Sequence, residues 1–352
     1  MRQTFVALFA MVALVRVADA QWLNYPDVRI PRAADGKPDL SAPAPRTPDG
    51  RPDLSGRWGL TATSIYIVNI MADMRPEDVP FQPWAEAVYE ARMAKDDPNV
   101  RCMPLGVPRY LNSPFKIMQT PDMVAVLYEI HTLYRQIFTD GRALPLNPNP
   151  SWLGYSIGRW EGDVFIVDSA GFNDQTWLDF YGHPHSEALR VVERFSRRDF
   201  GHMDVQVTID DPVAYTRPWT VTYALTFAAD TEMLETICET HAQILPRLVG
   251  TDLAHPPTRR SITIDPELLS RYAGTYELAP GRNVVVTMAG DRLTMKYPGN
   301  PNPILLFAES RTRFFGTIGD SVVEFPNNTE GRITSLVIHS SFPDQVAVRR
   351  TP

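Results

Sequence analysis

A polar stretch at residues 171–187 holds the side chains of this chain that are best suited to proton transfer. His183, His185 and Glu187 stand at alternate positions, and Asp179 lies four residues before the first of them. A histidine that is oriented by a carboxylate shuttles protons near neutral pH. We therefore predict acid–base catalysis in which His185 or His183 carries the proton and Asp179 or Glu187 orients the imidazole.

Several other side chains would complete such a site. Asn173 would stabilise an oxyanion, and Arg135 or Arg159 would bind an anionic group of the substrate. Together these groups suffice for hydration, dehydration, isomerisation or hydrolysis of a small organic molecule, without an organic cofactor. We expect the substrate to be held as well by aromatic side chains, namely Tyr155, Trp160 and Trp177.

The same histidines also suggest a metal site. Pro184 favours an extended backbone, in which alternate side chains point to the same side. His183, His185 and Glu187 would then offer three ligands to one divalent ion, with Asp179 as a fourth. No more distant ligand is recognisable, and the spacing matches no standard metalloenzyme motif. We therefore expect no cofactor and keep a divalent metal as an alternative.

Two further interpretations need no catalysis. In the first, the stretch is structural: Asn173, Asp174 and Ser186 cap turns, and the histidines hydrogen-bond the backbone. In the second, the protein is a non-catalytic carrier, since a β-barrel of moderate size holds one small ligand. Its apolar cavity would be lined by aromatic residues, namely Trp152, Tyr155, Trp160 and Trp177.

The polar stretch lies between two strand patterns of an all-β main domain, predicted over residues 59–245. Short runs of apolar or alternating residues, separated by turn signals, favour an antiparallel barrel-like fold. A long loop on such a scaffold is a common place for a site. The predicted strands are Phe115–Gln119, Met123–Glu129, Tyr134–Phe138, Tyr155–Trp160, Val164–Asp168, Leu189–Arg197, Met203–Ile209, Trp219–Phe227 and Leu234–Glu239.

One longer helix is predicted within the main domain, over Gln82–Lys95. Pro83 suits the first helical position because its missing N–H would have no partner there. Trp84, Val88 and Ala91 fall on one side of the helix and would form its buried face.

A second, smaller β domain is predicted over residues 261–352, after a proline-containing linker at residues 246–260. A short helix opens the domain, with Asp265 as N-cap and Pro266 at the first position. Many short strands separated by turns suit a small antiparallel barrel. These strands are Gly274–Glu277, Asn283–Met288, Arg292–Tyr297, Ile304–Ala308, Arg313–Phe315, Ser321–Phe325, Ile333–Ser340 and Val346–Arg349.

The N-terminal residues predict export. Arg2 precedes an apolar run, Phe5–Val15, and Ala18-Asp19-Ala20 suits cleavage by signal peptidase. Residues 1–20 are therefore interpreted as a signal peptide, and the expected location is periplasmic or secreted.

A proline-rich tandem repeat follows, within residues 21–58. The segment Pro31–Ser41 recurs fourteen residues later as Pro45–Ser55. Each copy has an Asp-Gly turn followed by a proline that blocks continued sheet pairing. We predict an extended arm that lies on the surface of the main domain.

Cysteine content and net charge indicate one disulfide bond and limit the classes of binding partner. The chain has two cysteines, Cys102 and Cys238, which in an exported protein favour one disulfide bond. Its formal net charge is −7 and no basic run occurs, so binding to nucleic acid is not expected. Beyond the N-terminal run no segment is long and apolar enough for membrane insertion. We expect a small-molecule partner, and self-association through the C-terminal domain is left open.

Two resemblances rest on these motifs. The pattern Leu269–Glu277, with Arg313-Phe314-Phe315 and the closing Ala347–Arg350, resembles the lipocalin-like tail domain of penicillin-binding-protein-like serine hydrolases. This resemblance covers the last quarter of the chain and implies a small barrel that assists substrate access or oligomerisation and does no chemistry. The remainder resembles an uncharacterised family of secreted bacterial proteins and implies no activity. Its motifs are Arg46–Trp58, Arg135–Phe138, Gly158–Asp163, Gly171–Asp174 and Ile209–Pro212.

Overall fold

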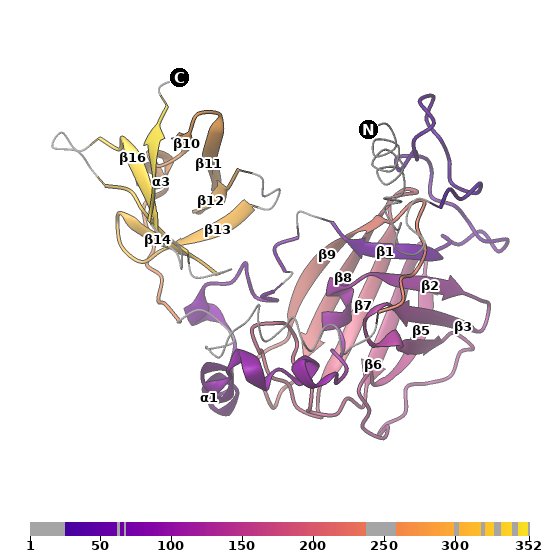
Figure 1. The fold of residues 1–352 in the computed structure, drawn as a ribbon. Coiled ribbons are helices and arrows are strands. Elements are labelled where there is room, and N and C mark those ends of the chain that lie inside the picture. The colour runs from indigo at the N-terminus through magenta and orange to yellow at the C-terminus, as the bar shows by residue number, and fades with distance from the viewer. Residues whose placement is uncertain are drawn as a thin grey trace, which may run out of the picture.

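Two closed β-barrels make up the computed structural model of the chain, which confirms the predicted all-β fold class (Figure 1). Few helices occur, and in the described part of the chain none is both long and apolar enough to cross a bilayer. The structure describes residues 25–61, 64–66, 68–236, 258–298, 303–317, 321–326, 332–339 and 344–350.

The first barrel contains nine strands that pair in chain order, with the last strand returning to the first. All neighbours are antiparallel except β4 and β5, which are parallel. A closed ring with an odd number of strands cannot alternate direction throughout, so one parallel pair is required. The strands are β1 Gly56–Leu60, β2 Phe115–Gln119, β3 Met123–Tyr128, β4 Tyr134–Phe138, β5 Tyr155–Glu161, β6 Val164–Ala170, β7 Arg190–Arg197, β8 His202–Asp210 and β9 Trp219–Phe227.

The strand that closes this barrel is β1, which overlaps the end of the predicted arm at residues 56–58. Trp58 pairs with Phe115 on one side and with Phe227 on the other, and it is fully buried. The predicted strand Leu234–Glu239 is wrong in its described part, because residues 234–236 form no strand; residues 237–239 lie outside the described residues. β1 went unrecognised because it continues directly from the proline-rich repeat, with no turn signal between them.

One α-helix, α1 (Pro83–Ala91), lies beside the first barrel, and it is shorter than predicted. Its buried residue is Ala85, whereas Trp84 is 41% exposed and donates its Nε1–H to the carbonyl of Val213 at 2.6 Å. The predicted buried face was therefore wrong by about one residue. Five short 3-10 helices also occur in the described part of this domain: η1 Pro76–Asp78 before α1, η2 Ala94–Asp96, η3 Pro98–Arg101 and η4 Arg109–Asn112 between α1 and β2, and η5 Ile130–Thr132 between β3 and β4.

The second barrel begins with the helix α3 (Pro266–Ser270), capped as predicted by Asp265, whose carboxylate accepts from the Glu267 N–H at 2.7 Å. Its eight strands are all antiparallel to their neighbours, and their core holds Tyr272, Tyr276 and Phe325. The strands are β10 Gly274–Ala279, β11 Arg282–Ala289, β12 Arg292–Lys296, β13 Pro303–Ala308, β14 Arg313–Gly316, β15 Val322–Glu324, β16 Ser335–His339 and β17 Gln345–Arg349.

The two copies of the tandem repeat fold in the same way on the first barrel. Each forms a small hairpin, closed by the bridges Arg32↔Pro38 and Arg46↔Pro52. The equivalent arginines then bind carboxylates of the barrel: Arg46 pairs with Asp163 at 2.6 Å, and Arg32 pairs with Asp230 at 2.5 Å. Each copy of the repeat thus binds the first barrel in the same way, through an arginine at the start of its hairpin.

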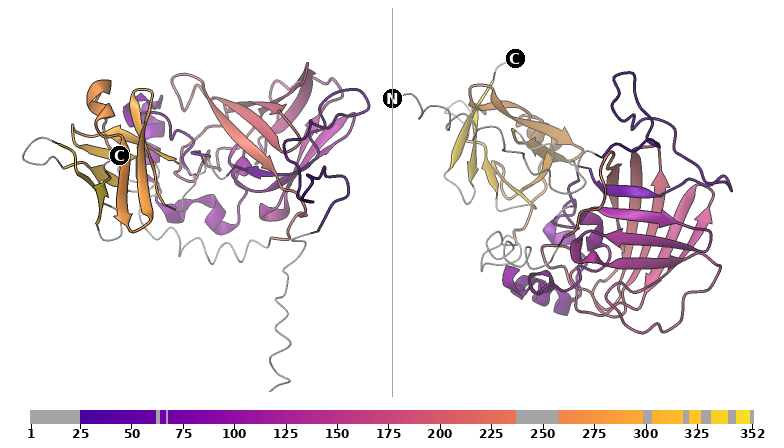
Figure 2. Two further views of the ribbon diagram at one scale, coloured as in Figure 1. Left: turned by 90° about the horizontal axis from the view of Figure 1, so that it is seen from above. Right: turned by 45° about the vertical axis from the view of Figure 1, so that its right-hand side comes forward.

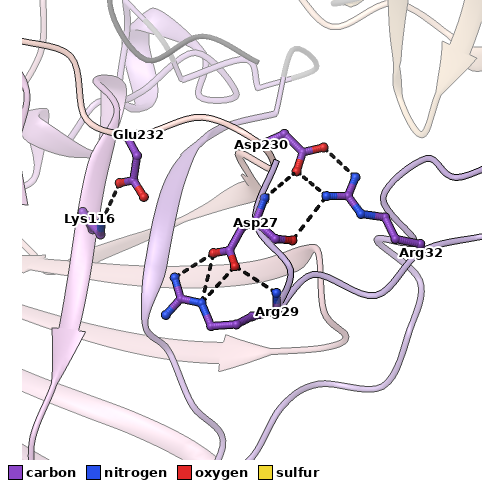
Figure 3. A network of polar contacts seen from close by, with 6 residues as sticks. All are labelled: Asp27, Arg29, Arg32, Lys116, Asp230 and Glu232. Atoms are coloured by element: carbon purple, nitrogen blue, oxygen red, sulfur yellow. Dashed lines mark hydrogen bonds and ion pairs between the residues drawn. The ribbon is translucent and has the colours of Figure 1, made fainter. Parts of the chain in front are cut away.

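The anchor at Arg32 belongs to a wider network of polar contacts (Figure 3). Asp230 also accepts the backbone N–H of Asp27 at 3.2 Å, while the carboxylate of Asp27 binds Arg29. Lys116 of β2 pairs with Glu232 nearby at 2.7 Å. The contacts of Asp27 and Arg32 with Asp230 join the arm to the chain that follows β9, and the Lys116–Glu232 pair joins β2 to the same chain.

The two barrels lie beside one another as separate bodies, and the segment from residue 68 to α1 lies between them (Figures 1 and 2). This segment makes hydrogen bonds to both barrels. Through these hydrogen bonds the segment contacts both the loop that follows β6 and the C-terminal domain.

Candidate active site

The loop between β6 and β7 contains the polar stretch, and the end of β8 holds it in place. Asp211 follows β8 and accepts from both the backbone N–H and the hydroxyl of Ser186, at 2.6 and 2.8 Å. The buried hydroxyl of Tyr215 donates to the carbonyl of Pro184 at 2.7 Å. Asp211 itself is buried, and these bonds fix the path of the chain through His183 and His185.

Within this loop, Asp179 and His183 form a buried pair. Asp179 Oδ2 lies 2.6 Å from His183 Nδ1, and neither side chain is exposed by more than a few per cent. The carboxylate also accepts the backbone N–H groups of Ile70 at 2.8 Å, Tyr181 at 3.0 Å and His183 at 3.1 Å. All four contacts stabilise the anionic form of Asp179.

The protonation state of the pair follows from these contacts. Burial by itself raises the pKa of Asp179, but the imidazole of His183 and the N–H donors outweigh it and hold that pKa below its usual range. An ionised carboxylate only accepts, so Nδ1 of a neutral His183 carries the hydrogen and Nε2 has the free lone pair. Nε2 is therefore the basic atom of the pair.

Aromatic rings fix the plane of the His183 imidazole. The ring of Phe81 stacks on it with centroids 5.6 Å apart and an angle of 11°, and the ring of Tyr89 lies 4.5 Å away. Burial, followed by the charge of Asp179, raises the pKa of Tyr89, so its phenol stays protonated near neutral pH. No hydrogen-bond partner for Nε2 occurs among the residues that the structure describes.

His183 lines an open cavity between the two barrels, whose space is about 730 Å³ when the part open to solvent is included. The walls are largely apolar and aromatic, while the charged lining side chains are Glu86, Glu90 and Arg259. The first barrel and its neighbouring segments contribute Asn69, Met71, Met74, Pro76, Val79, Phe81, Tyr89 and Tyr181, and the C-terminal part contributes Thr258, Phe315, Gly316, Thr317 and Ser321.

His185 has a different environment, although only one residue separates it from His183. Its Nε2 lies 2.7 Å from the hydroxyl of Thr176, and its Nδ1 lies 3.1 Å from the carbonyl of Ser186. Burial lowers the pKa of His185, so it is neutral near pH 7. Both ring nitrogens are thus used in structural hydrogen bonds, and His185 does not line the cavity.

The remaining residues of the predicted proton-transfer set also lie away from the pair. Glu187 is exposed to solvent. Asn173 forms a turn, in which its side-chain oxygen accepts the N–H of Gln175 at 3.2 Å. His183, His185 and Glu187 thus have separate environments in the structure, with no partner in common. In the described ranges no group of three or more His, Cys, Asp and Glu side chains has the geometry of a metal site.

Arg135 lies inside the first barrel rather than at the cavity. Its guanidinium pairs with Glu193 at 2.6 Å and donates to the hydroxyls of Ser156 and Ser169 at 3.0 and 2.7 Å. The charge of Glu193 compensates the burial of Arg135, and the pKa of Arg135 stays above its ordinary value. The arginine is therefore fully engaged within the barrel.

The other residues expected to bind substrate lie elsewhere on the first barrel. Arg159 is exposed and pairs with Glu161. Trp160 packs on Phe165, and Trp177 is buried beneath the guanidinium of Arg92, which lies 4.8 Å from the ring centre. The ring of Tyr155 stacks on Phe138, and its hydroxyl accepts from Arg142 at 3.0 Å. These four and Arg135 are absent from the described cavity lining.

Sequence reasoning missed the residues that give His183 its environment. Phe81 and Tyr89 come from the segment around α1, about 100 positions away in the chain. Ile70 contributes only its backbone N–H, which leaves no trace in the residue type. The one available signal was the presence of Phe81 and Tyr89 around the predicted helix, where the sequence had assigned a buried role to Trp84 alone among the aromatic residues.

Three further predictions involve residues outside the described ranges. Cys238 lies there, so the disulfide with Cys102 stays a prediction. The signal peptide, residues 1–20, lies there too, and export likewise stays a prediction. Residues 246–257 of the predicted linker also lie outside the described residues.

Comparisons with known proteins identify part of the chain. Residues 258–349 match the family described as a domain of unknown function, DUF3471. The second barrel therefore belongs to an uncharacterised domain family. No curated protein matches the chain. A solved structure described as the crystal structure of SurE with D-Leu matches 46% of this chain and 35% of that chain, at 14% identity and a TM-score of 0.22. That similarity is too low to support an argument.

Proposed function

We propose that the protein is an enzyme that acts on a small organic molecule by acid–base chemistry in the cavity between the barrels. His183 is the proton carrier and Asp179 orients it. The observation that supports this proposal is the pairing of Nδ1 with a buried carboxylate, which leaves Nε2 as a base at the wall of a cavity. A carboxylate that orients an imidazole in one tautomer is a recurring device of enzymes.

The proton path follows from the tautomer. Nε2 removes a proton from a C–H or O–H group of the substrate, and the imidazolium that forms is stabilised by the charge of Asp179. The same Nε2–H then returns the proton to another atom of the substrate or to a leaving oxygen. Isomerisation and the addition or loss of water need no further redox partner, and hydrolysis needs only a water molecule.

The charge of the cavity favours one kind of substrate. Two of its charged lining residues are Glu86 and Glu90, and the third, Arg259, pairs with Glu309 at 3.0 Å. We expect an uncharged or cationic molecule with an apolar body to be preferred over an anion. Arg135 and Arg159, which were predicted to bind an anionic group of the substrate, are not among the described residues that line this cavity.

The proposed location rests on the N-terminal sequence and not on the site. The sequence pattern of residues 1–20 supports export, and we propose a periplasmic or secreted enzyme that requires no organic cofactor. A carrier of small molecules is the alternative, since the apolar cavity wall suits either function.

Metabolite screening of paired variants tests the proposal. Wild type and His183→Gln are incubated with a panel of small hydroxy and carbonyl compounds, and turnover is followed by mass spectrometry. We expect the substitution to lower turnover about 10²- to 10⁴-fold, the usual contribution of a general acid–base. The matched control is His202→Gln, because His202 also pairs with an aspartate, Asp199, at 2.8 Å but lies on the barrel surface.

Each outcome of the screen decides between the functions. Loss of turnover in His183→Gln with full turnover in His202→Gln supports the enzyme. Equal turnover by wild type and His183→Gln removes His183 from the chemistry. Compounds that bind wild type in calorimetry, yet are converted by neither protein, favour the carrier.

A further inference from the structure

The oxygen of Asp179 that binds His183 also binds a backbone amide from another part of the chain. Oδ2 accepts Nδ1–H of His183 at 2.6 Å and the N–H of Ile70 at 2.8 Å. The side chain of Ile70 is fully buried, so this amide is held in the core. The orientation of the catalytic pair therefore depends on the position of the segment around Ile70.

That segment is held from the other side by the C-terminal barrel. The side-chain amide of Asn69 donates to the carbonyl of Thr317 at 3.0 Å, and the hydroxyl of Thr317 donates to the carbonyl of Ala72 at 2.8 Å. The two bonds flank Ile70 in the chain. Asn69 also accepts the N–H of Met71 at 2.9 Å, which closes the turn.

The rest of the segment is docked on the same barrel. Arg292 donates to the carbonyl of Asp73, and Arg75 contacts Asp291 at 3.2 Å and the hydroxyl of Thr263 at 3.0 Å. These contacts hold the segment on the C-terminal barrel, and none of them involves Asp179 or His183. Thr317 is distinct because it also lines the cavity.

We propose that Thr317 of the C-terminal barrel is a positioning residue of the active site, acting through the turn at residues 69–72 on the Ile70 amide and hence on Asp179. The proposal rests on the function proposed above for His183. It assigns a role to the DUF3471 domain: that domain closes the cavity and sets the orientation of the catalytic carboxylate. In this proposal the second barrel acts through its contacts with the turn.

The role of Thr317 can be separated from simple folding by conservative variants. Thr317→Val keeps the shape of the side chain and removes the hydroxyl donor, while Thr317→Ser keeps the donor. Asn69→Asp is a second variant, because it retains the acceptor for Met71 and removes the donor to Thr317. The matched control is Thr287→Val, whose hydroxyl bonds Thr294 at 2.8 Å on the same barrel, away from the turn.

Nitrogen NMR of full-length protein labelled at histidine gives a readout that needs no substrate. The signal of His183 is assigned by its loss in His183→Gln. In wild type we expect one tautomer, with hydrogen on Nδ1 and a bare Nε2. In Thr317→Val and Asn69→Asp we expect both signals to move toward the averaged positions of exchanging tautomers, whereas Thr317→Ser and Thr287→Val keep the wild-type positions.

Kinetics on a compound found in the screen gives the second readout. We expect kcat of Thr317→Val to fall about tenfold with KM little changed, as for other small errors of orientation, and Thr317→Ser to restore it. An unchanged His183 spectrum in folded Thr317→Val, or equal impairment in Val and Ser variants, overturns the positioning role. Failure of the proposed function is a different result, because His183→Gln would then retain turnover while the NMR comparison still reports on Thr317.

Discussion

His183 and His185 lie two positions apart in one loop, are equally buried, and have opposite roles in the structure. His183 binds a carboxylate through one nitrogen and presents the other at a cavity. His185 uses both nitrogens to bind a hydroxyl and a backbone carbonyl. The difference teaches that burial and residue type alone do not mark a candidate proton carrier. The candidate is the histidine that has one nitrogen paired with a carboxylate and that also lines a cavity.

The difference between His183 and His185 is tested most strongly by a substitution of Asp179, the residue that pairs with His183. Asp179→Asn replaces an acceptor with a group that can donate to Nδ1, which favours the tautomer with hydrogen on Nε2 and no base at the cavity. We expect kcat to fall about 10²- to 10⁴-fold. Steady-state kinetics on a screened substrate measures the effect.

The control for that substitution is Asp199→Asn at the surface pair with His202, which should keep wild-type kinetics. A kcat of Asp179→Asn within a few-fold of wild type would contradict the orienting role of Asp179 and weaken the distinction between the two loop histidines.

A change at the second histidine should affect stability rather than chemistry. His185→Gln disturbs the buried bonds to Thr176 and Ser186, and we expect a loss of about 1–3 kcal/mol in the free energy of unfolding. Activity per folded molecule should stay at the wild-type level. Urea unfolding and kinetics on the same sample make the test, and a loss of kcat in fully folded protein would place His185 in the catalytic machinery.

His185 and Asp179, two buried ionisable groups of the same loop, also differ in how they affect the stability of the fold in acid. Burial lowers the pKa of His185 below its ordinary value of 6.5, so the unfolded chain takes up a proton first and the fold loses stability as pH falls from above 6.5 toward the folded pKa. The pKa of Asp179 is lowered below 3.8, and its stabilisation is lost only as pH falls further, through that folded value.

Unfolding free energies measured from pH 8 to pH 3 should therefore show two separate differences from wild type. His185→Gln should remove the part of the pH dependence that begins near 6.5, because the titrating group is gone. The unfolding free energy of Asp179→Asn should differ least from that of wild type at the lowest pH, because the stabilisation by ionised Asp179 is being lost there. An identical pH dependence for wild type and His185→Gln would mean that the pKa of His185 is not lowered in the folded protein.

Much of the scaffold follows from local pattern. The second barrel was predictable strand by strand, because each of its short runs is bounded by turn residues such as Ala289-Gly290-Asp291. In the first barrel the alternation of Met203, Val205 and Val207 places these side chains inside, and all three are fully buried. The closing strand β1 was not recognisable, since its pairing with β2 and β9 depends on residues far away in the chain.

For the candidate site, the sequence alone placed His183 in one loop with Asp179, an acidic residue close enough to orient its imidazole. It offered no way to choose between His183 and His185, since both stand in the same local pattern. Tertiary structure made that choice, by bringing Phe81, Tyr89 and the Ile70 amide to one histidine and Thr176 to the other. The physical reason is that a cavity and a hydrogen-bond network belong to distant segments in contact, whereas a sequence pattern records only neighbours along the chain.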